Sequence, residues 1–137
     1  PRVNPVPQRA ENLLLAEDNV VNQKVALMLL QRMGYRADVA ANGHEVIDAV
    51  RRQPYDILLM DVQMPEMDGI EATRRIVAMT PDPQRRPWII ALTANAMLGD
   101  RERCMAAGMN DYISKPIDRE ELAAALARAV MRRPPQA

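Results

Sequence analysis

Five short apolar runs alternate with segments of helical periodicity, and this alternation constrains the fold more than any other feature. We predict strands at residues 13–16, 35–40, 55–60, 88–92 and 112–113. Strands this uniformly apolar are typical of parallel sheets that are buried on both faces. Five strand–helix units in series therefore predict an α/β fold: a five-stranded parallel sheet of flavodoxin-like order 2-1-3-4-5, with helices on both faces.

Local signals predict where the helices begin and end. The first helical segment carries apolar residues every four positions, and Gly34 follows it as a predicted C-terminal cap. Asp68 and Asp118 have the side chains of N-terminal caps for two later helices. Asn42-Gly43 is predicted to be a turn.

The two ends of the chain are predicted to be linkers. Residues 1–11 contain three prolines and no apolar periodicity, and residues 133–137 are similar. A folded domain is therefore expected over residues 12–132, and a chain of 137 residues suits one domain. We expect this domain to have been cut from a longer chain, with a single-domain protein that carries tails as the alternative.

Charge and cysteine content exclude several classes of protein. Eighteen basic residues balance 18 acidic ones, so no general attraction to nucleic acid or to a membrane surface is expected. A single cysteine, Cys104, forms no internal disulfide. Apolar runs stay well below the ~18 residues of a membrane span. We predict a cytoplasmic domain with no membrane insertion of its own.

Polar side chains stand where four of the predicted strands end. Glu17 and Asp18 follow the first strand, Asp61 the third, Thr93 the fourth, and Lys115 comes just after the fifth. Ligands of doubly wound sheets bind at the carboxyl ends of the strands. The fold should therefore gather these five side chains on one edge, although they are scattered along the chain.

The chemistry of this group favours a metal ion and a phosphoryl group. Three clustered carboxylates repel one another unless a cation lies between them, and all-oxygen ligands favour Mg²⁺. Lys115 and Thr93 would stabilise the charge on a transferring phosphoryl group. Asp61 is then either a metal ligand only or the nucleophile itself.

These residues resemble the receiver (response-regulator) domain of two-component signalling. The resemblance covers about Asn12 to Met131. It rests on the pair Glu17-Asp18, MDVQMPEMDG around Asp61, LTANA around Thr93 and DYISKPI around Lys115. The runs AEDNVVNQKVA and NGHEVI look most like receivers of hybrid sensor histidine kinases.

The resemblance implies a role for each acidic position. Asp61 would accept a phosphoryl group from a phosphohistidine. Asp18 and Asp61 would bind Mg²⁺ directly, with the backbone carbonyl of Gln63 as a further ligand, and Glu17 would act through water. Many family members have Asp where Glu17 stands, which puts the detailed metal geometry in doubt.

The resemblance also implies the groups that respond to the phosphoryl group. Lys115 would pair with it and Thr93 would hydrogen-bond to it. Tyr112 matches the aromatic residue whose rotamer follows the threonine. The Lys115-Pro116 peptide bond is expected to be cis, as it is in many members.

The implied partners are the phosphohistidine domain of a histidine kinase, a histidine phosphotransfer protein, or both. The domain would not be a turnover enzyme, because it would catalyse only its own phosphorylation and dephosphorylation. In the family, the rate of dephosphorylation depends on the side chains that correspond to Gln63 and Asn95.

Three rival functions remain to be weighed. An aspartyl-phosphate phosphohydrolase would place its nucleophile after the first strand with a second acid two residues on, whereas position 63 is Gln. A flavin or nucleotide binder would need a glycine-rich or hydroxyl-rich loop where EDNVVNQ stands. An unphosphorylated receiver-like docking module usually lacks the counterparts of Asp61 or Lys115, and both are present.

Overall fold

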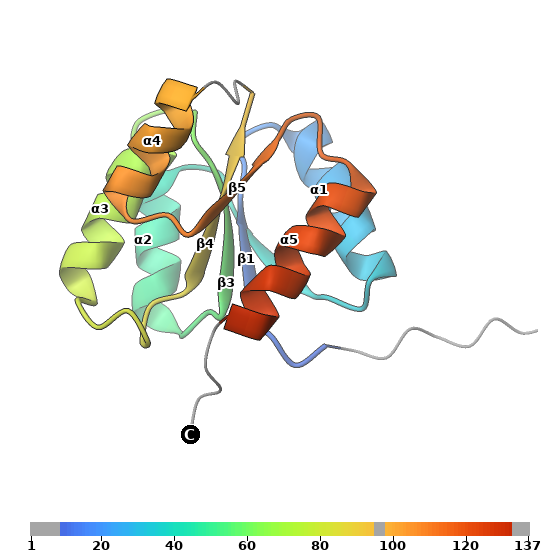
Figure 1. Ribbon diagram of the computed structural model, residues 1–137, viewed down its shortest axis with the longest axis horizontal. Coiled ribbons are helices and arrows are strands. Elements are labelled where there is room, and N and C mark those ends of the chain that lie inside the picture. The colour runs from blue at the N-terminus through green and yellow to red at the C-terminus, as the bar shows by residue number, and fades with distance from the viewer. Residues whose placement is uncertain (1–8, 95–97, 133–137) are drawn as a thin grey trace, which may run out of the picture.

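The computed structural model describes residues 9–94 and 98–132, in which strands and helices alternate strictly (Figure 1). The elements are β1 (Leu13–Ala16), α1 (Val20–Arg32), β2 (Ala37–Ala40), α2 (Gly43–Arg52), β3 (Ile57–Asp61), α3 (Gly69–Met79), β4 (Trp88–Thr93), α4 (Leu98–Ala107), β5 (Asp111–Ser114) and α5 (Arg119–Arg132).

All four neighbouring strand pairs are parallel, and the order is β2-β1-β3-β4-β5, which confirms the predicted fold. Figure 1 shows α1 and α5 on one face of the sheet and α2, α3 and α4 on the other. The order reverses between β1 and β3, so the carboxyl ends of these central strands form the topological switch point where such sheets bind ligands.

The sheet divides the apolar core into two layers because successive side chains of a strand point to opposite faces. The layer beneath α2, α3 and α4 contains Leu14, Ala16, Leu58, Met60, Ile89 and Ala91. The layer beneath α1 and α5 contains Leu13, Leu15, Ile57, Leu59, Ile90 and Leu92. Both layers anchor the strands that carry the polar residues at the edge.

Some predicted boundaries differ from the observed ones. Asn42-Gly43 is the start of α2 rather than a free turn, because the Asn42 side chain accepts a hydrogen bond from the Glu45 N–H and caps the helix. β2 begins only at Ala37, and β3 extends to include Asp61. The caps predicted at Asp68 and Asp118 are confirmed, since each side chain accepts an N–H three residues later.

Helix α1 forms as predicted, but the first half of its predicted apolar face points outward, whereas Leu29 and Met33 pack partly buried against the core. Val21 is 67% exposed, Val25 is 40% exposed and Met28 is 44% exposed. The buried face is made by Ala26 and Leu30, which pack against the sheet. Helical spacing therefore identified the helix, and its four-residue face is covered only in the second half of the helix.

The segment that enters β1 is tied to neighbouring loops. The Arg9 N–H donates to the Gly34 carbonyl, and the Arg9 guanidinium lies 5.7 Å from the centre of the Tyr35 ring. The Asn12 carbonyl accepts the N–H groups of both Asp56 and the first residue of β3. The division into residues 1–11, 12–132 and 133–137 stays a prediction.

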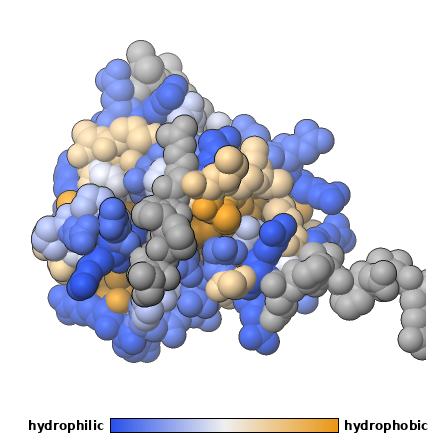
Figure 2. All heavy atoms as spheres, turned by 60° about the horizontal axis from the view of Figure 1, so that its bottom comes forward, coloured by the Kyte–Doolittle hydropathy of each residue, from blue (hydrophilic) through white to orange (hydrophobic). Residues whose placement is uncertain are grey.

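The end of the molecule where the chain enters β1 is covered largely by hydrophilic side chains, with smaller apolar areas (Figure 2). Among the described helices, none combines the length and apolar character needed to cross a membrane.

Candidate functional site

The carboxyl ends of the strands surround an open cleft of about 690 Å³. Its walls include all five side chains singled out from the sequence: Glu17, Asp18, Asp61, Thr93 and Lys115. They follow or end four different strands, so the parallel topology brings together groups that lie up to about a hundred residues apart.

Asp61 is the last residue of β3 and is 3% exposed. Its Oδ2 accepts a hydrogen bond from Lys115 Nζ at 2.7 Å, and its Oδ1 accepts the Gln63 N–H at 3.1 Å. Gly69 packs close behind the strand end, where a Cβ would collide with the Asp61 carbonyl. Both carboxylate oxygens are therefore held by hydrogen bonds, and the backbone behind them is closely packed.

Glu17 follows β1 and is also buried, at 2% exposed. Its Oε1 accepts the Asn19 N–H at 3.1 Å and the Asn22 side-chain amide at 3.3 Å. Its Oε2 lies 3.0 Å from Lys115 Nζ but has no hydrogen bond of good geometry in the described part of the chain. One buried carboxylate oxygen thus remains available to another electropositive group.

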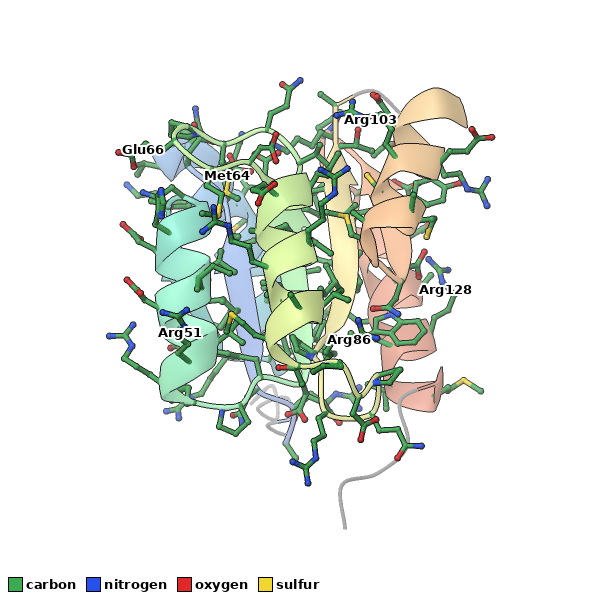
Figure 3. The ribbon with its side chains drawn as sticks, turned by 90° about the vertical axis from the view of Figure 1, so that its left-hand side faces the viewer. Arg51, Met64, Glu66, Arg86, Arg103 and Arg128 are labelled. Carbon is green, nitrogen blue, oxygen red and sulfur yellow. The ribbon has the colours of Figure 1, made fainter. Side chains whose placement is uncertain are left out.

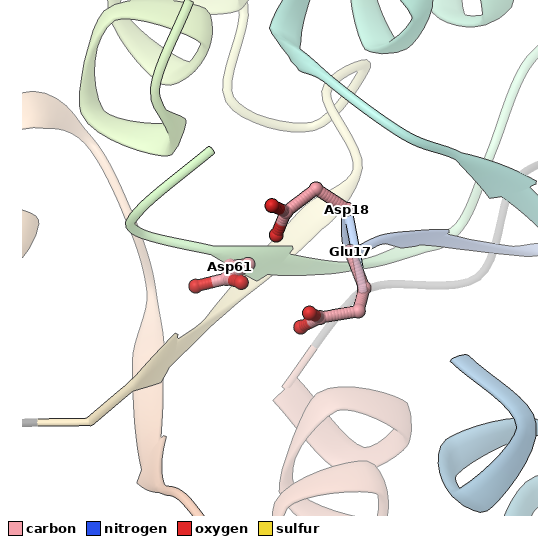
Figure 4. Close-up of side chains that lie close together, drawn as sticks. All are labelled: Glu17, Asp18 and Asp61. Carbon is pink, nitrogen blue, oxygen red and sulfur yellow. The ribbon is translucent and has the colours of Figure 1, made fainter. Parts of the chain in front are cut away.

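Asp18 completes the acidic cluster from the exposed side. One oxygen from each of Glu17, Asp18 and Asp61 lies within 4.8 Å of the others, as the close-up in Figure 4 illustrates. Three convergent carboxylates, one of them with an unsatisfied buried oxygen, form a ligand set that suits a hard divalent cation.

The surroundings of the cluster shift the pKa values of the two buried acids, Asp61 and Glu17, in opposite directions. Burial raises the pKa of Asp61 to about 6, with Glu17 adding to the rise and Lys115 opposing it. Burial also acts to raise the pKa of Glu17, but the neighbouring Asp61 carboxyl group, the Lys115 ammonium and the Asn19 N–H together outweigh burial and lower it. Burial acts to lower the pKa of Lys115, but both carboxylates raise it, so the ammonium is retained. Of the two buried acids, Asp61 is therefore the one whose ionised form the site disfavours.

Thr93 and Tyr112 lie on the adjacent strands β4 and β5, and Thr93 lines the cleft. Thr93 is 5% exposed at the end of β4, and its carbonyl accepts the Lys115 N–H at 2.8 Å. Tyr112 on β5 is half-buried, and the Arg101 guanidinium from α4 lies 4.7 Å from the centre of its ring. The Lys115-Pro116 peptide bond is cis.

Of the two positions predicted to tune dephosphorylation, Gln63 and Asn95, the structure describes only Gln63. Gln63 has an exposed side chain on the wall of the cleft. Asn95 lies outside the described residues.

Sequence reasoning missed several residues of the cleft. Asn19 and Asn22 hold Glu17, and the Gln23 amide donates to the Glu17 carbonyl at 2.6 Å. All three lie within six residues of Glu17, so the polar character of DNVVNQ was an available signal. Asp100 and Arg103 also line the cleft from α4, and nothing in the linear sequence connected them with it.

The fold and the site define a class of protein: a doubly wound α/β domain with a three-carboxylate cluster suited to a cation and one lysine-paired aspartate at the switch point. The chain belongs to the response regulator receiver domain family, which it matches over residues 13–127. This finding confirms the resemblance stated from the sequence.

Individual relatives agree with this assignment. The chain is 41% identical over 132 residues to hybrid signal transduction histidine kinase K of Dictyostelium discoideum, covering 90% of this chain and 11% of the kinase. The receiver domain of the sensor histidine kinase PA1611 from Pseudomonas aeruginosa, solved with magnesium coordinated in its active-site cleft, matches with a TM-score of 0.80 and 46% identity. That match covers 90% of this chain and 99% of the PA1611 chain.

A further solved structure is more distant in sequence. The co-crystal structure of the Saccharomyces cerevisiae histidine phosphotransfer protein Ypd1 with the receiver domain of its downstream response regulator Ssk1 gives a TM-score of 0.83 at 27% identity. This match covers 97% of this chain and 95% of the other. The chain spans only about a tenth of the length of the hybrid kinase that it matches.

Proposed function

We propose that this domain is a phosphoacceptor that takes a phosphoryl group from a phosphohistidine onto Asp61. The observation that carries the proposal is the position of Asp61: a buried carboxylate at the switch point, 2.7 Å from Lys115 Nζ and within a three-acid cluster. Asp18 is exposed, and Glu17 is held through its Oε1 by Asn19 and Asn22, so Asp61 at the end of the central strand β3 is the acid best placed to act as a nucleophile.

The residues fit Mg²⁺ as the resident cation, and the same ion occupies the cleft of the PA1611 receiver. Glu17, Asp18 and Asp61 would hold it together with the Gln63 carbonyl, and it would neutralise negative charge during transfer. Charge neutralisation and positioning supply most of the catalysis in phosphoryl transfer, so few other groups are needed.

The transfer itself is a displacement at phosphorus. A carboxylate oxygen of Asp61 forms a bond to phosphorus while the phosphorus–nitrogen bond breaks, and the departing imidazole retains the electron pair and takes up a proton. Lys115 moves from the carboxylate to a phosphoryl oxygen, and the Thr93 hydroxyl donates to another. These groups belong to the domain, so it catalyses its own phosphorylation without turning over a substrate.

We further infer that phosphorylation changes the surface beside β5. Thr93 and Tyr112 lie on adjacent strands, with Ala91 opposite Tyr112 in the register. If Thr93 is drawn toward the phosphoryl group, Tyr112 can turn into the space that it leaves. A local change in charge would thus bias an element with two arrangements.

The outward stripe of α1, formed by Val21, Val25 and Met28, fits a partner that approaches the site. The stripe begins within one helical turn of the Asn19 cap, next to the acidic cluster. Exposed apolar residues that line up on one helix face mark a protein interface. We infer that a histidine phosphotransfer protein or the phosphohistidine domain of a kinase docks there, in a parent hybrid histidine kinase on the cytoplasmic side.

Intact mass after incubation with acetyl phosphate tests the chemistry. We expect one phosphoryl addition that requires Mg²⁺ and is lost in Asp61→Asn, but kept in the control Asp48→Asn, which changes an exposed acid on α2. No addition to folded protein with several donors would instead support the alternative function, an unphosphorylated receiver-like docking module. The same assay measures the rate of phosphoryl loss, which we expect to depend on Gln63 and Asn95.

A second experiment tests docking separately from chemistry. Val21→Lys should slow phosphoryl transfer from a phosphorylated histidine phosphotransfer protein by about tenfold or more, because it places a charge in the apolar stripe. Phosphorylation by acetyl phosphate should be unchanged. Equal transfer rates for Val21→Lys and the wild type would remove α1 from the interface.

A further inference from the structure

Arg103 lines the same cleft as Asp61, although it is carried by α4 on the far side of the cleft from β1. Figure 3 shows Arg103 at the end of the molecule that also holds Met64 and Glu66, whereas Arg86 lies toward the opposite end. We propose that Arg103 is a specificity-determining residue that draws anionic phosphodonors into the cleft and binds their phosphoryl oxygens. The proposal rests on the phosphoacceptor function and names a selectivity of the same site.

The charges around the cleft create the need for such a residue. Five carboxylates line it among the described residues, and only two cationic side chains do, Lys115 and Arg103. A bound divalent cation would still leave negative charge in excess. A phosphodonor is itself an anion, so its approach is opposed unless a cation lies on its path.

Lys115 is committed within the cluster and is poorly placed to meet an incoming donor. Its Nζ lies 2.7 Å from Asp61 and 3.0 Å from Glu17, and its side chain is only 21% exposed. It becomes available to the phosphoryl group only as that group reaches Asp61. The early part of the approach must therefore rely on another cation.

Arg103 has the complementary properties. Its side chain is 65% exposed, and its described ion pair is with Asp100 at 3.5 Å, on the same helix. Such an exposed pair contributes little stability and can exchange for a better acceptor. The arginines that are held more firmly, Arg75 and Arg128, make hydrogen bonds of 3.1 and 2.7 Å to their carboxylates and lie outside the cleft.

The guanidinium group suits this role because its planar fork of N–H donors matches phosphoryl oxygens in a two-point contact. Asp100 would hold the fork at the rim between encounters. The attraction should be stronger for a donor of larger negative charge. Acetyl phosphate, which is mostly dianionic at neutral pH, should therefore benefit more than phosphoramidate, which carries less net negative charge.

The test compares second-order rate constants of phosphorylation, measured by intact mass with Mg²⁺ present. We expect Arg103→Gln to slow the reaction with acetyl phosphate by about 3- to 10-fold and the reaction with phosphoramidate by less than about 2-fold. Added KCl should slow the wild type more than the variant, because salt screens the attraction. Arg103→Lys should recover part of the rate.

Arg51→Gln is the matched control, since Arg51 is exposed on α2 and lies outside the cleft. If Arg103→Gln behaves like Arg51→Gln, or slows both donors equally, the proposal is overturned. A wild type that is never phosphorylated would overturn the proposed function along with it. A wild type that reacts normally, with rates unaffected by Arg103, would overturn the selectivity alone.

Discussion

Asp61→Asn should make the metal-free protein more stable while abolishing its phosphorylation. The structure buries this carboxylate beside Glu17, and together these effects raise its pKa from 3.8 to about 6. Asparagine has nearly the same shape but carries no charge. The substitution therefore removes a charge that the folded state holds less favourably than the unfolded chain does.

The size of the effect follows from the pKa. A rise from 3.8 to about 6, at about 1.4 kcal/mol per pKa unit, corresponds to roughly 3 kcal/mol of destabilisation at neutral pH. Asparagine also gives up the strong contact with Lys115 and relaxes imperfectly. We therefore expect a gain of about 1 to 3 kcal/mol in the free energy of unfolding at pH 7.

The stabilisation expected for Asp61→Asn depends on pH. The pKa in the folded state lies above that in the unfolded state, so ionised Asp61 costs stability above about pH 6 and costs nothing below about pH 4. The gain of Asp61→Asn should accordingly shrink as the pH falls through this window. Subtracting the wild-type curve from that of the variant isolates this group from the other acids.

Urea unfolding measures the effect, with a chelator present and at several pH values between 4 and 7.5. Saturating Mg²⁺ should stabilise the wild type and reduce or reverse the advantage of the variant, because the ion binds the folded carboxylate cluster. If the metal-free variant is no more stable than the wild type at pH 7, or if its gain persists unchanged at pH 4, the electrostatic account of the cluster is wrong.

Three other substitutions test different parts of the site. Gly69→Ala would press a Cβ against the carbonyl of the aspartate that ends β3, so we expect a loss of about 1 to 3 kcal/mol in urea unfolding; Gly99→Ala, which meets open space, should cost nothing and serves as its control. Lys115→Met leaves two buried acids without their cation, and we expect lower stability at pH 7 and slower phosphorylation in the mass assay. Arg101→Ala removes the guanidinium from the face of Tyr112, and the ring resonances of Tyr112 should broaden or shift in NMR spectra while the rate of phosphorylation stays the same.

Much of the fold could be predicted from the sequence, because the lengths of the apolar runs and their alternation with helical segments both indicated a parallel sheet. Apolar runs such as the one that ends at Asp61 are too short for helices and too continuous for a half-exposed strand, so a buried parallel sheet was the consistent choice. The same topology then placed Glu17 and Lys115 on one edge, although 98 positions separate them in the numbering. The site could be predicted from the order of the strands in the sequence, because the carboxyl ends of parallel strands lie on the same side of the sheet.

The features that escaped prediction depend on contacts that a periodic pattern does not contain. The α1 stripe has the spacing of a core face, yet Ala26 and Leu30 fill the available space against the sheet and leave Val21 outside. Asn42 could begin a helix or make a turn, and only the N–H that it accepts decides between them. Arg103 lines the cleft only through the tertiary packing of α4, which the linear sequence does not contain.

The positions at which the chain enters and leaves the domain have a consequence for engineering. β1 begins, and α5 ends, at the end of the molecule opposite Asp61 (Figure 1). Reporter proteins or surface tags joined at either terminus would therefore sit away from the cleft. The domain could be immobilised through both ends on a sensor chip with its phosphoacceptor edge still facing the solution.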